Sequence, residues 1–208
     1  MQFKSFTCGF LENVAYLVWD GNNAVLFDAP YGSYSTIIPF LEAENLQLNA
    51  IILTHSHFDH ILDVHKFKQN KNLKVYAHQA DEDRLLDPME HLPPGIPLQI
   101  ESIKADSYLE DGQELQFGEM KLKIIHTPGH TLGGVCIELI GEKKIITGDT
   151  LFRAGIGRTD FTGGNFEDIE HSIREKLYIY PDDYYIFPGH GPSSTIGFEK
   201  KKNPYVKM

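Results

Sequence analysis

Residues 50–60, AIILTHSHFDH, join a short apolar run to three histidines and an aspartate. The apolar half is typical of a buried strand, and the polar side chains follow at its carboxyl end. Because residues i and i+2 of an extended segment face the same way, His55 and His57 can bind one ion together. Asp59 continues that side, and His60 can turn inward as a helix begins. The stretch therefore predicts half of a metal site at the end of a strand.

The composition is that of a globular protein. The chain has 208 residues, 41% hydrophobic and 23% charged, so we expect one folded domain over residues 1–208. A formal net charge of −10 argues against nucleic acid as the main partner. With only Cys8 and Cys136 present, neither a disulfide framework nor a thiolate zinc site is expected. No signal-peptide core and no membrane-length apolar run stand out, so we expect a cytoplasmic protein without a membrane partner.

Hydrophobic alternation and turn residues predict many short strands separated by helices. The expected strands cover residues 15–20, 24–28, 50–54, 73–78, 120–126, 134–139, 143–147 and 184–188. A helix should run to about Asn45 from a cap at Ser33 or Ser35, with Pro39 tolerated only in its first turn. Two sheets with helices packed outside them, or an open α/β sheet, both fit this pattern.

Further along the chain, apolar residues recur at helical spacing over residues 61–67, and Pro88 should stop a short polar helix. A longer helix is expected from Phe166 to Tyr178, with Asn165 as its cap. The segment 88–97, PMEHLPPGIP, holds four prolines and a glycine. It must be a loop, and it could serve as a lid over a site.

Three later strands also end in ligand-type residues, often beside glycine. Strand ends that meet at one edge of a sheet are where α/β proteins build sites. The candidate ligands are His55, His57, Asp59, His60, His130, Asp149 and His190. Seven are too many for one tetrahedral ion but fit two ions that share a carboxylate. Imidazole and carboxylate without thiolate suit zinc, iron or manganese, so we expect two divalent ions, with zinc favoured.

In this order the segments HSHFDH, HTPGHTLGG, TGDTLF, AGIGRTDF and PGHGPSST resemble the metallo-β-lactamase superfamily. Within it they look most like the glyoxalase II-related hydrolases, particularly the short bacterial form. The resemblance covers nearly the whole chain and implies an α+β fold, a four-layer αββα sandwich. It also implies a first metal held by His55, His57 and His130, a second held by Asp59, His60 and His190, and Asp149 as the bridge.

The same resemblance implies a dinuclear hydrolase that cleaves a small-molecule thioester such as S-lactoylglutathione. Two close metals lower the pKa of a shared water from about 15.7 toward about 7. A thiolate, with a pKa of about 8.5, leaves without help from a general acid. Asp59 would orient the nucleophile and take its proton. Arg158 is the first candidate to hold a substrate carboxylate, and Arg153 is the second.

Some features depart from the two-domain glyoxalase II enzymes. Those enzymes carry a carboxyl-terminal helical domain that supplies basic residues for glutathione, and we expect none here because only 18 residues follow His190. Their loop after the bridging aspartate carries a lysine and, two residues later, a tyrosine. Here Arg158 and Asp160 stand at those positions, and Pro192 replaces a second tyrosine. The resemblance thus leaves open a weaker grip on glutathione or a different substrate.

Other functions fit parts of the pattern. A persulfide dioxygenase would hold a single iron with two of the histidines and Asp149, and it shares the GRTDF loop, but PGHGP favours the hydrolases. β-Lactam hydrolysis is less expected without a secretion signal, while hydrolysis of a lactone or another ester is compatible with the same metals. A closed structural zinc site is disfavoured because such sites have four ligands and are often rich in cysteine.

The remaining polar candidates have simpler explanations. His65, His78, His91, His126 and His171 lack a comparable setting and are not expected to bind metal. His126 could still support a ligand from behind, since it is close to His130 in sequence. Arg158 could brace its own loop by pairing with Asp160 instead of binding substrate, and Arg153 is expected to be structural.

Overall fold

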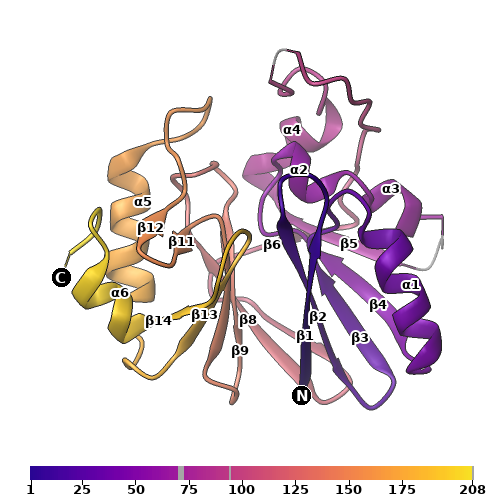
Figure 1. Ribbon diagram of the computed structural model, residues 1–208, viewed down its shortest axis with the longest axis horizontal. Coiled ribbons are helices and arrows are strands. Elements are labelled where there is room, and N and C mark those ends of the chain that lie inside the picture. Colours follow the sequence, from indigo (N-terminus) through magenta and orange to yellow (C-terminus); the bar gives the residue numbers. More distant parts are fainter. Residues whose placement is uncertain (70–72, 94, 208) are drawn as a thin grey trace.

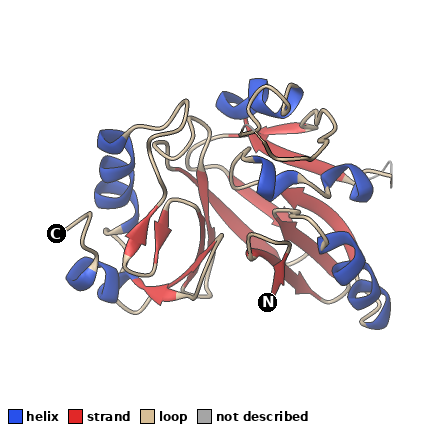
Figure 2. Cartoon of the chain, turned by 45° about the horizontal axis from the view of Figure 1, so that its top comes forward, coloured by secondary structure: helices blue, strands red, loops and turns tan. Residues whose placement is uncertain are grey.

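Two β-sheets face each other, and helices cover the outer face of each (Figure 1). The computed structural model describes residues 1–69, 73–93 and 95–207. Helices α1 to α4 lie outside the first sheet, and α5 and α6 lie outside the second (Figure 2). The expected four-layer αββα sandwich is therefore confirmed, and the open α/β sheet is excluded.

The first sheet has the strand order β1-β2-β3-β4-β5-β6. Its strands are β1 (Gln2–Cys8), β2 (Asn13–Asp20), β3 (Asn23–Phe27), β4 (Gln47–Ile52), β5 (Lys74–His78) and β6 (Ser107–Leu109). The first three are antiparallel, whereas β3 to β6 run parallel, so the carboxyl ends of β3, β4 and β5 share one edge. The predicted hairpin of β2 and β3 is confirmed, but β1 and β6 were missed.

The second sheet has the order β14-β13-β10-β9-β8-β7. Its strands are β7 (Glu114–Phe117), β8 (Met120–His126), β9 (Val135–Leu139), β10 (Lys144–Gly148), β13 (Tyr185–Pro188) and β14 (Ser194–Thr195), while β11 (Leu151–Phe152) and β12 (Gly155–Ile156) form a separate hairpin. Strands β10 and β13 are parallel. Their carboxyl ends therefore lie together and direct the loops that follow toward the first sheet.

Alternation along the strands explains the layers. In β2, Leu17 packs under the outer helices while Val18 faces the second sheet. In β9, Ile137 faces the first sheet and Cys136 packs beneath α5 and α6. Since successive side chains of a strand point to opposite faces, a strand that is apolar at every position is buried on both sides. Three apolar cores result, one between each pair of layers.

The helices are α1 (Ser33–Ala43), α2 (Phe58–Ile61), α3 (Val64–Phe67), α4 (Glu82–Leu86), α5 (Phe166–Ser172), which continues as a π-helical turn (Ile173–Leu177), and α6 (Ile196–Lys202). Asn165 caps α5 as predicted, because its side chain accepts a hydrogen bond from the Asp168 N–H at 3.1 Å. A short polar helix does end before Pro88, and the 61–67 segment is helical but is interrupted between α2 and α3. Residue 94 of the predicted 88–97 loop lies outside the described residues.

Two predictions about α1 were wrong. Pro39 lies well inside the helix and not in its first turn. Proline has no N–H to donate to the Ser35 carbonyl one turn earlier. The residue is tolerated because Pro39 and Ser35 are on the exposed side of the helix, where water can bind that carbonyl. The cap is Gly32, with φ of 82°, and not Ser33 or Ser35, and the Ser35 hydroxyl donates to the Gly32 carbonyl. Among the described residues, no helix is both long and apolar enough to cross a bilayer.

Candidate metal centre

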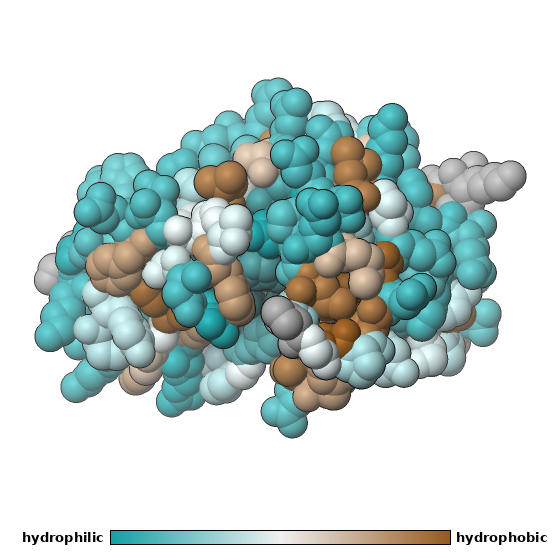
Figure 3. Space-filling model, turned by 90° about the horizontal axis from the view of Figure 1, so that it is seen from above, coloured by the Kyte–Doolittle hydropathy of each residue, from teal (hydrophilic) through white to brown (hydrophobic). Residues whose placement is uncertain are grey.

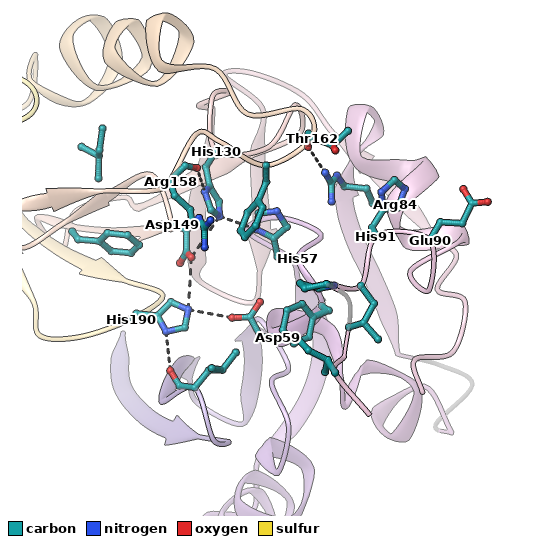
Figure 4. A pocket seen from close by; sticks show the side chains of 18 residues that line it. His57, Asp59, Arg84, Glu90, His91, His130, Asp149, Arg158, Thr162 and His190 are labelled. Atoms are coloured by element: carbon teal, nitrogen blue, oxygen red, sulfur yellow. Dashed lines mark hydrogen bonds and ion pairs between the residues drawn. The ribbon is translucent and has the colours of Figure 1, made fainter. Parts of the chain in front are cut away.

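All seven predicted ligands converge at one edge of the sandwich. His55 and His57 follow β4, and α2 places Asp59 and His60 in its single turn. The other three follow strands of the opposite sheet: His130 comes after β8, Asp149 after β10 and His190 after β13. Figure 4 shows five of the seven around one open space, with His190 and Asp149 on one side and His57 on the other.

The ligand atoms form three overlapping groups, in each of which they lie within 4.8 Å of one another. The groups are His55 with His57 and His130, His55 with His60 and Asp149, and Asp59 with His60 and His190. The first and third are the two sets that the sequence resemblance implies, and the second joins them through Asp149. The geometry thus brings the residues together as predicted, while their roles as ligands stay predictions.

Asp149 occupies the middle of this arrangement. Its carboxylate oxygens lie 3.5 Å from Nε2 of His60, 3.6 Å from Nε2 of His130 and 3.7 Å from Nε2 of His190. Among the described residues, Asp149 Oδ1 and the Nε2 atoms of His55 and His57 are buried without a hydrogen-bond partner. Buried polar atoms are rarely left unpaired. A cation that contacts Asp149 Oδ1 and His55 Nε2 would satisfy both atoms, while His57 brings its Nδ1 to 2.8 Å from Nε2 of His130. The donor set therefore fits metal ions.

Burial controls the protonation of the histidines. Desolvation and the neighbouring His130 lower the pKa of His57 to about 3, and desolvation holds the pKa of His55 well below its usual range. Both rings are therefore neutral near pH 7, which is the form that binds metal. At His60 burial opposes the charge, but Asp149 and Asp59 outweigh it and raise the pKa. The pKa values of the histidines are thus lowered in the half of the site that holds His55 and His57, and that of His60 is raised in the other half.

Hydrogen bonds from behind orient several of the rings. Nδ1 of His60 lies 2.8 Å from the Asp28 carboxylate, and Nδ1 of His130 lies 2.8 Å from the Arg158 carbonyl. Nδ1 of His190 is 3.1 Å from the Leu11 carbonyl. In all three residues this contact fixes the ring and leaves Nε2 facing the shared space, as is usual for metal-binding histidines.

Asp28 and Asp81 are two buried carboxylates that sequence reasoning missed. Asp28 accepts hydrogen bonds from the Thr54 N–H at 2.7 Å and the Thr54 hydroxyl at 2.8 Å, in addition to its contact with His60. No motif marks Asp28, which is simply the last residue of the predicted strand 24–28. Its backbone has φ of 59°, an uncommon conformation for any residue but glycine. Asp28 therefore ties the end of β3 to the histidine cluster.

Asp81 joins two of the ligand loops. Its Oδ2 accepts from the Ser56 N–H and the Thr131 hydroxyl, both at 2.9 Å, and its Oδ1 accepts from the Gly133 N–H at 2.6 Å. Ser56 lies between His55 and His57, and Thr131 follows His130, the third member of the same ligand group. The carboxylate therefore sets the distance between parts of the site that are about 75 residues apart in sequence. In sequence it was only one acid of a polar helix.

The amino-terminal hairpin also reaches the centre. The Asn13 side-chain amide donates to Asp59 Oδ2 at 2.8 Å and lies 3.2 Å from Nε2 of His190. The Val14 N–H donates to the Gly189 carbonyl at 2.8 Å, so the backbone segments are also joined. A Cβ added to Gly189 would lie 2.3 Å from Asp149 Oδ1, which explains why this position requires glycine. Asn13 was not among the sequence candidates.

A pocket of about 780 Å³ opens above the centre. Its apolar lining comes from several separate segments and comprises Leu11, Phe58, Leu92, Pro93, Ile96, Phe152, Ile156 and Phe161. The predicted 88–97 loop thus borders the site through its described residues. Figure 3 looks down on this edge and shows apolar side chains on both sides of the hollow between the two halves.

The structure separates the two candidate arginines. Arg158 lines the pocket, but its Nε and Nη2 donate to Asp160 at 2.8 and 2.7 Å, so the loop-bracing alternative is present. Arg153 is not part of the pocket lining and lies over the Phe198 ring, 5.3 Å from its centroid. The structure thus packs Arg153 against α6 and does not bring it to the pocket, and a substrate-binding role for it stays an untested prediction.

His126 does not support the centre either. Its ring stacks on His78 with a centroid distance of 3.9 Å, and its Nε2 contacts the Leu132 carbonyl. The suggestion that it supports a ligand is wrong, because the ring lies on the same face of β8 as Leu122 and Ile124 and meets His78 of the first sheet, not a candidate ligand. His91, in contrast, lines the pocket, although no metal group includes it among the described residues.

Comparison with known proteins identifies the family. The family profile described as the metallo-beta-lactamase superfamily matches residues 8–190. The chain belongs to the metallo-beta-lactamase superfamily. Members of this superfamily bind divalent metals, in agreement with the clustered histidines and aspartates.

Individual members of the superfamily resemble the chain along most of its length. Hydroxyacylglutathione hydrolase GloC of Haemophilus influenzae is 36% identical over 204 residues, which cover 95% of this chain and 93% of GloC. The crystal structure of the BLEG-1 B3 metallo-beta-lactamase is 34% identical with a TM-score of 0.91, and all of both chains is covered. That of ETHE1 from Myxococcus xanthus is 25% identical with a TM-score of 0.82, covering 99% of this chain and 84% of ETHE1.

Proposed function

We propose that the protein is a metal-dependent hydrolase of thioesters, with two divalent ions held by the seven converging residues. The observation that carries this proposal is the set of overlapping ligand groups joined by Asp149 at the floor of an apolar pocket. His55, His57 and His130 would hold one ion, and Asp59, His60 and His190 the other. Zinc is the first choice, with iron or manganese as alternatives. This is an open site and not a closed four-ligand one.

The metal pair, when bound, supplies an acidified water and polarises a carbonyl. The chain's own residues direct this chemistry. Asn13 fixes the carboxylate of Asp59 by donating to Oδ2 at 2.8 Å, which leaves Oδ1 to orient a water and hold its proton. His60 lowers the pKa of Asp59 despite its burial, so the carboxylate is ionised and ready to accept that proton. The apolar lining excludes other water from the reacting carbonyl.

Thioesters fit this site better than oxygen esters or amides. A thiolate leaving group has a pKa of about 8.5 and departs without a proton donor. Among the described residues that line the pocket, lysine, tyrosine and cysteine are absent, so an acid for a poor leaving group would have to come from a histidine or from a protonated carboxyl group such as that of Asp59 or Glu90. The likeness to GloC of Haemophilus influenzae supports hydroxyacylglutathione as the first substrate to test.

S-lactoylglutathione tests the proposal directly. Protein loaded with zinc or manganese should release glutathione, a chelator should stop the reaction, and added metal should restore it. Asp59→Asn should keep the fold and lower kcat by about 100-fold or more, because it removes the proton acceptor. The exposed Asp83→Asn serves as the matched control. Absence of cleavage of S-lactoylglutathione and of simpler thioesters by metal-loaded protein would reject the proposal.

A persulfide dioxygenase is the second candidate, favoured by the likeness to ETHE1 of Myxococcus xanthus. It would use one iron held by two histidines and Asp149. The fully assembled group of Asp59, His60 and His190 supports the hydrolase instead, because a single-iron site leaves these side chains without a role. Oxygen uptake on glutathione persulfide with about one iron per chain would decide for the dioxygenase.

β-Lactam hydrolysis is the third candidate, favoured by the likeness to the BLEG-1 metallo-beta-lactamase. A lactam differs from a thioester in its nitrogen leaving group, which must be protonated as it departs. Nitrocefin turnover can therefore be compared with thioester cleavage on one preparation. The proposal predicts the larger kcat/KM for the thioester, and the reverse order would replace it. A lactone assayed beside them tests the remaining ester alternative.

A further inference from the structure

The pocket contains a second arginine, Arg84, that sequence reasoning did not select. It comes from α4, is partly buried and lines the wall opposite His190 (Figure 4). One Nη2 hydrogen bond holds it to the Thr162 carbonyl. Among the described residues Arg84 makes no ion pair, since Asp81 is occupied by three other donors and Glu90 points away from it in Figure 4. Arg84 is therefore a pocket cation that no carboxylate of the described residues contacts in an ion pair, although the charge of Asp81 acts on it.

Arg158 differs from Arg84 in this respect. Its guanidinium forms a two-point pair with Asp160, and it lies over the Phe161 ring, 3.8 Å from the centroid. Two of its donors and most of its charge are thus already engaged. A substrate carboxylate would have to compete with Asp160, whereas at Arg84 it would meet free N–H donors.

The surroundings of Arg84 make an anionic partner favourable. Burial lowers its pKa and the charge of Asp81 opposes this only in part, so the charged form has lost hydration. Its positive charge in turn acts on His57, so it lies close to the first group of ligands. Phe161, the neighbour of Thr162, has its ring 5.6 Å from that of His57. The guanidinium therefore stands beside the reaction centre, on the wall of the pocket that also carries His91 and Thr162 (Figure 4).

We propose that Arg84 binds a carboxylate of the substrate and sets a preference for anionic over neutral thioesters. The predicted preference among substrates rests on the proposed thioester hydrolysis, whereas the predicted binding of a carboxylate by Arg84 does not. The carboxylate can belong to the acyl group or to the thiol. Arg84 is thus a specificity-determining residue, and Arg158 is a brace for the loop that carries Phe161.

Two pairs of thioesters that differ by one carboxylate test the proposal. S-succinyl- and S-butanoyl-N-acetylcysteamine vary the acyl side, and the lactoyl thioesters of 3-mercaptopropionate and N-acetylcysteamine vary the thiol side. The zinc-loaded wild type should prefer the anionic member of at least one pair. Arg84→Gln should reduce that preference by roughly ten-fold or more through KM, as expected for a lost charged hydrogen bond. Arg84→Lys should restore part of it.

Arg158→Gln and Arg174→Gln are the matched controls. Arg174 pairs with Glu170 on the outer helix and should not affect the preference. If Arg158→Gln removes the preference while Arg84→Gln keeps it, Arg158 binds the carboxylate and the proposal is wrong. A wild type without preference also overturns it. A merely structural Arg84 would lower kcat/KM equally for both members of each pair.

A binding measurement separates this inference from the proposed function. Calorimetry on zinc-loaded protein can compare S-methylglutathione, which carries carboxylates and cannot be hydrolysed as a thioester, with neutral N-acetyl-S-methylcysteamine. Arg84→Gln should weaken only the first, by roughly ten-fold. If no thioester is cleaved but this difference is found, the thioesterase proposal fails and the Arg84 assignment stands. Equal binding of S-methylglutathione by wild type and variant rejects the assignment.

Discussion

Replacing Asp81 by asparagine should loosen the metal centre without touching a ligand. The Asp81 carboxylate accepts three hydrogen bonds, two at Oδ2 and one at Oδ1. An asparagine offers a single acceptor oxygen. Whichever way its amide turns, its NH₂ group faces at least one of the donors from Ser56, Thr131 or Gly133. Because that donor is buried, at least one charged hydrogen bond is lost and not replaced by water.

The magnitude follows from the number of bonds. A hydrogen bond to a charged group contributes about 1.5 to 3 kcal/mol, and the remaining two become neutral and weaker. We therefore expect Asp81→Asn to lower the free energy of unfolding by about 3 kcal/mol. Because Asp81 connects the loop of His55 and His57 to the loop of His130, zinc affinity should also fall, by roughly 10- to 100-fold.

Two measurements on the same preparations test this prediction. Urea unfolding of metal-free protein gives the change in stability, and competition with a chromophoric chelator gives the zinc affinity. Asp83→Asn is the matched control, because Asp83 is exposed on α4, two residues after Asp81, and should change either value little. The reasoning is refuted if Asp81→Asn leaves unfolding within about 0.5 kcal/mol and zinc affinity within about two-fold of wild type.

Three further changes have defined outcomes. Gly189→Ala should displace Asp149 or His60, since the added Cβ would lie 2.3 Å and 2.6 Å from their side chains. Metal analysis should then show fewer bound ions per chain than in the wild type, whereas the control Gly155→Ala should show no loss. Asn13→Ala should lower kcat and change KM little, because it removes the hydrogen bond that fixes the Asp59 carboxylate. Unchanged kinetics would show that this hydrogen bond is not needed for catalysis. Burial and His126 lower the pKa of His78 in the folded protein. The unfolded chain therefore binds a proton at this residue at higher pH than the folded protein does. As the pH falls below about 6.5, this difference lowers the free energy of unfolding. In the His126→Gln variant, NMR titration should show a higher pKa for His78 than in the wild type. An unchanged pKa would mean that the stacked His126 ring does not affect the protonation of His78.

Much of the site could be predicted because its candidate ligands lie in short sequence motifs directly after apolar strands. HSHFDH places His55 and His57 on one side of an extended segment, and each distant ligand follows an apolar strand. Strand ends can be found from hydrophobic alternation, and parallel neighbours place them on one edge. The αββα fold itself came from the family resemblance, since the strand pattern alone left an open α/β sheet possible.

The supporting residues could not be predicted, because nothing in their local sequence marks them. Asp28 and Asp81 are single acids whose role appears only when Thr54, Ser56 and Thr131 are brought to them by the fold. Asn13 acts through β2, whose antiparallel partner β1 was missed. Pro39 shows the opposite error, in which a sound local rule failed because that side of the helix faces solvent.

Counting bound metal tests the central claim most directly. Wild-type protein saturated with zinc and freed of excess should carry two ions per chain. His190→Gln should retain one, because the group of His55, His57 and His130 remains complete. A wild-type value of one ion per chain that His190→Gln leaves unchanged would contradict the two-ion centre.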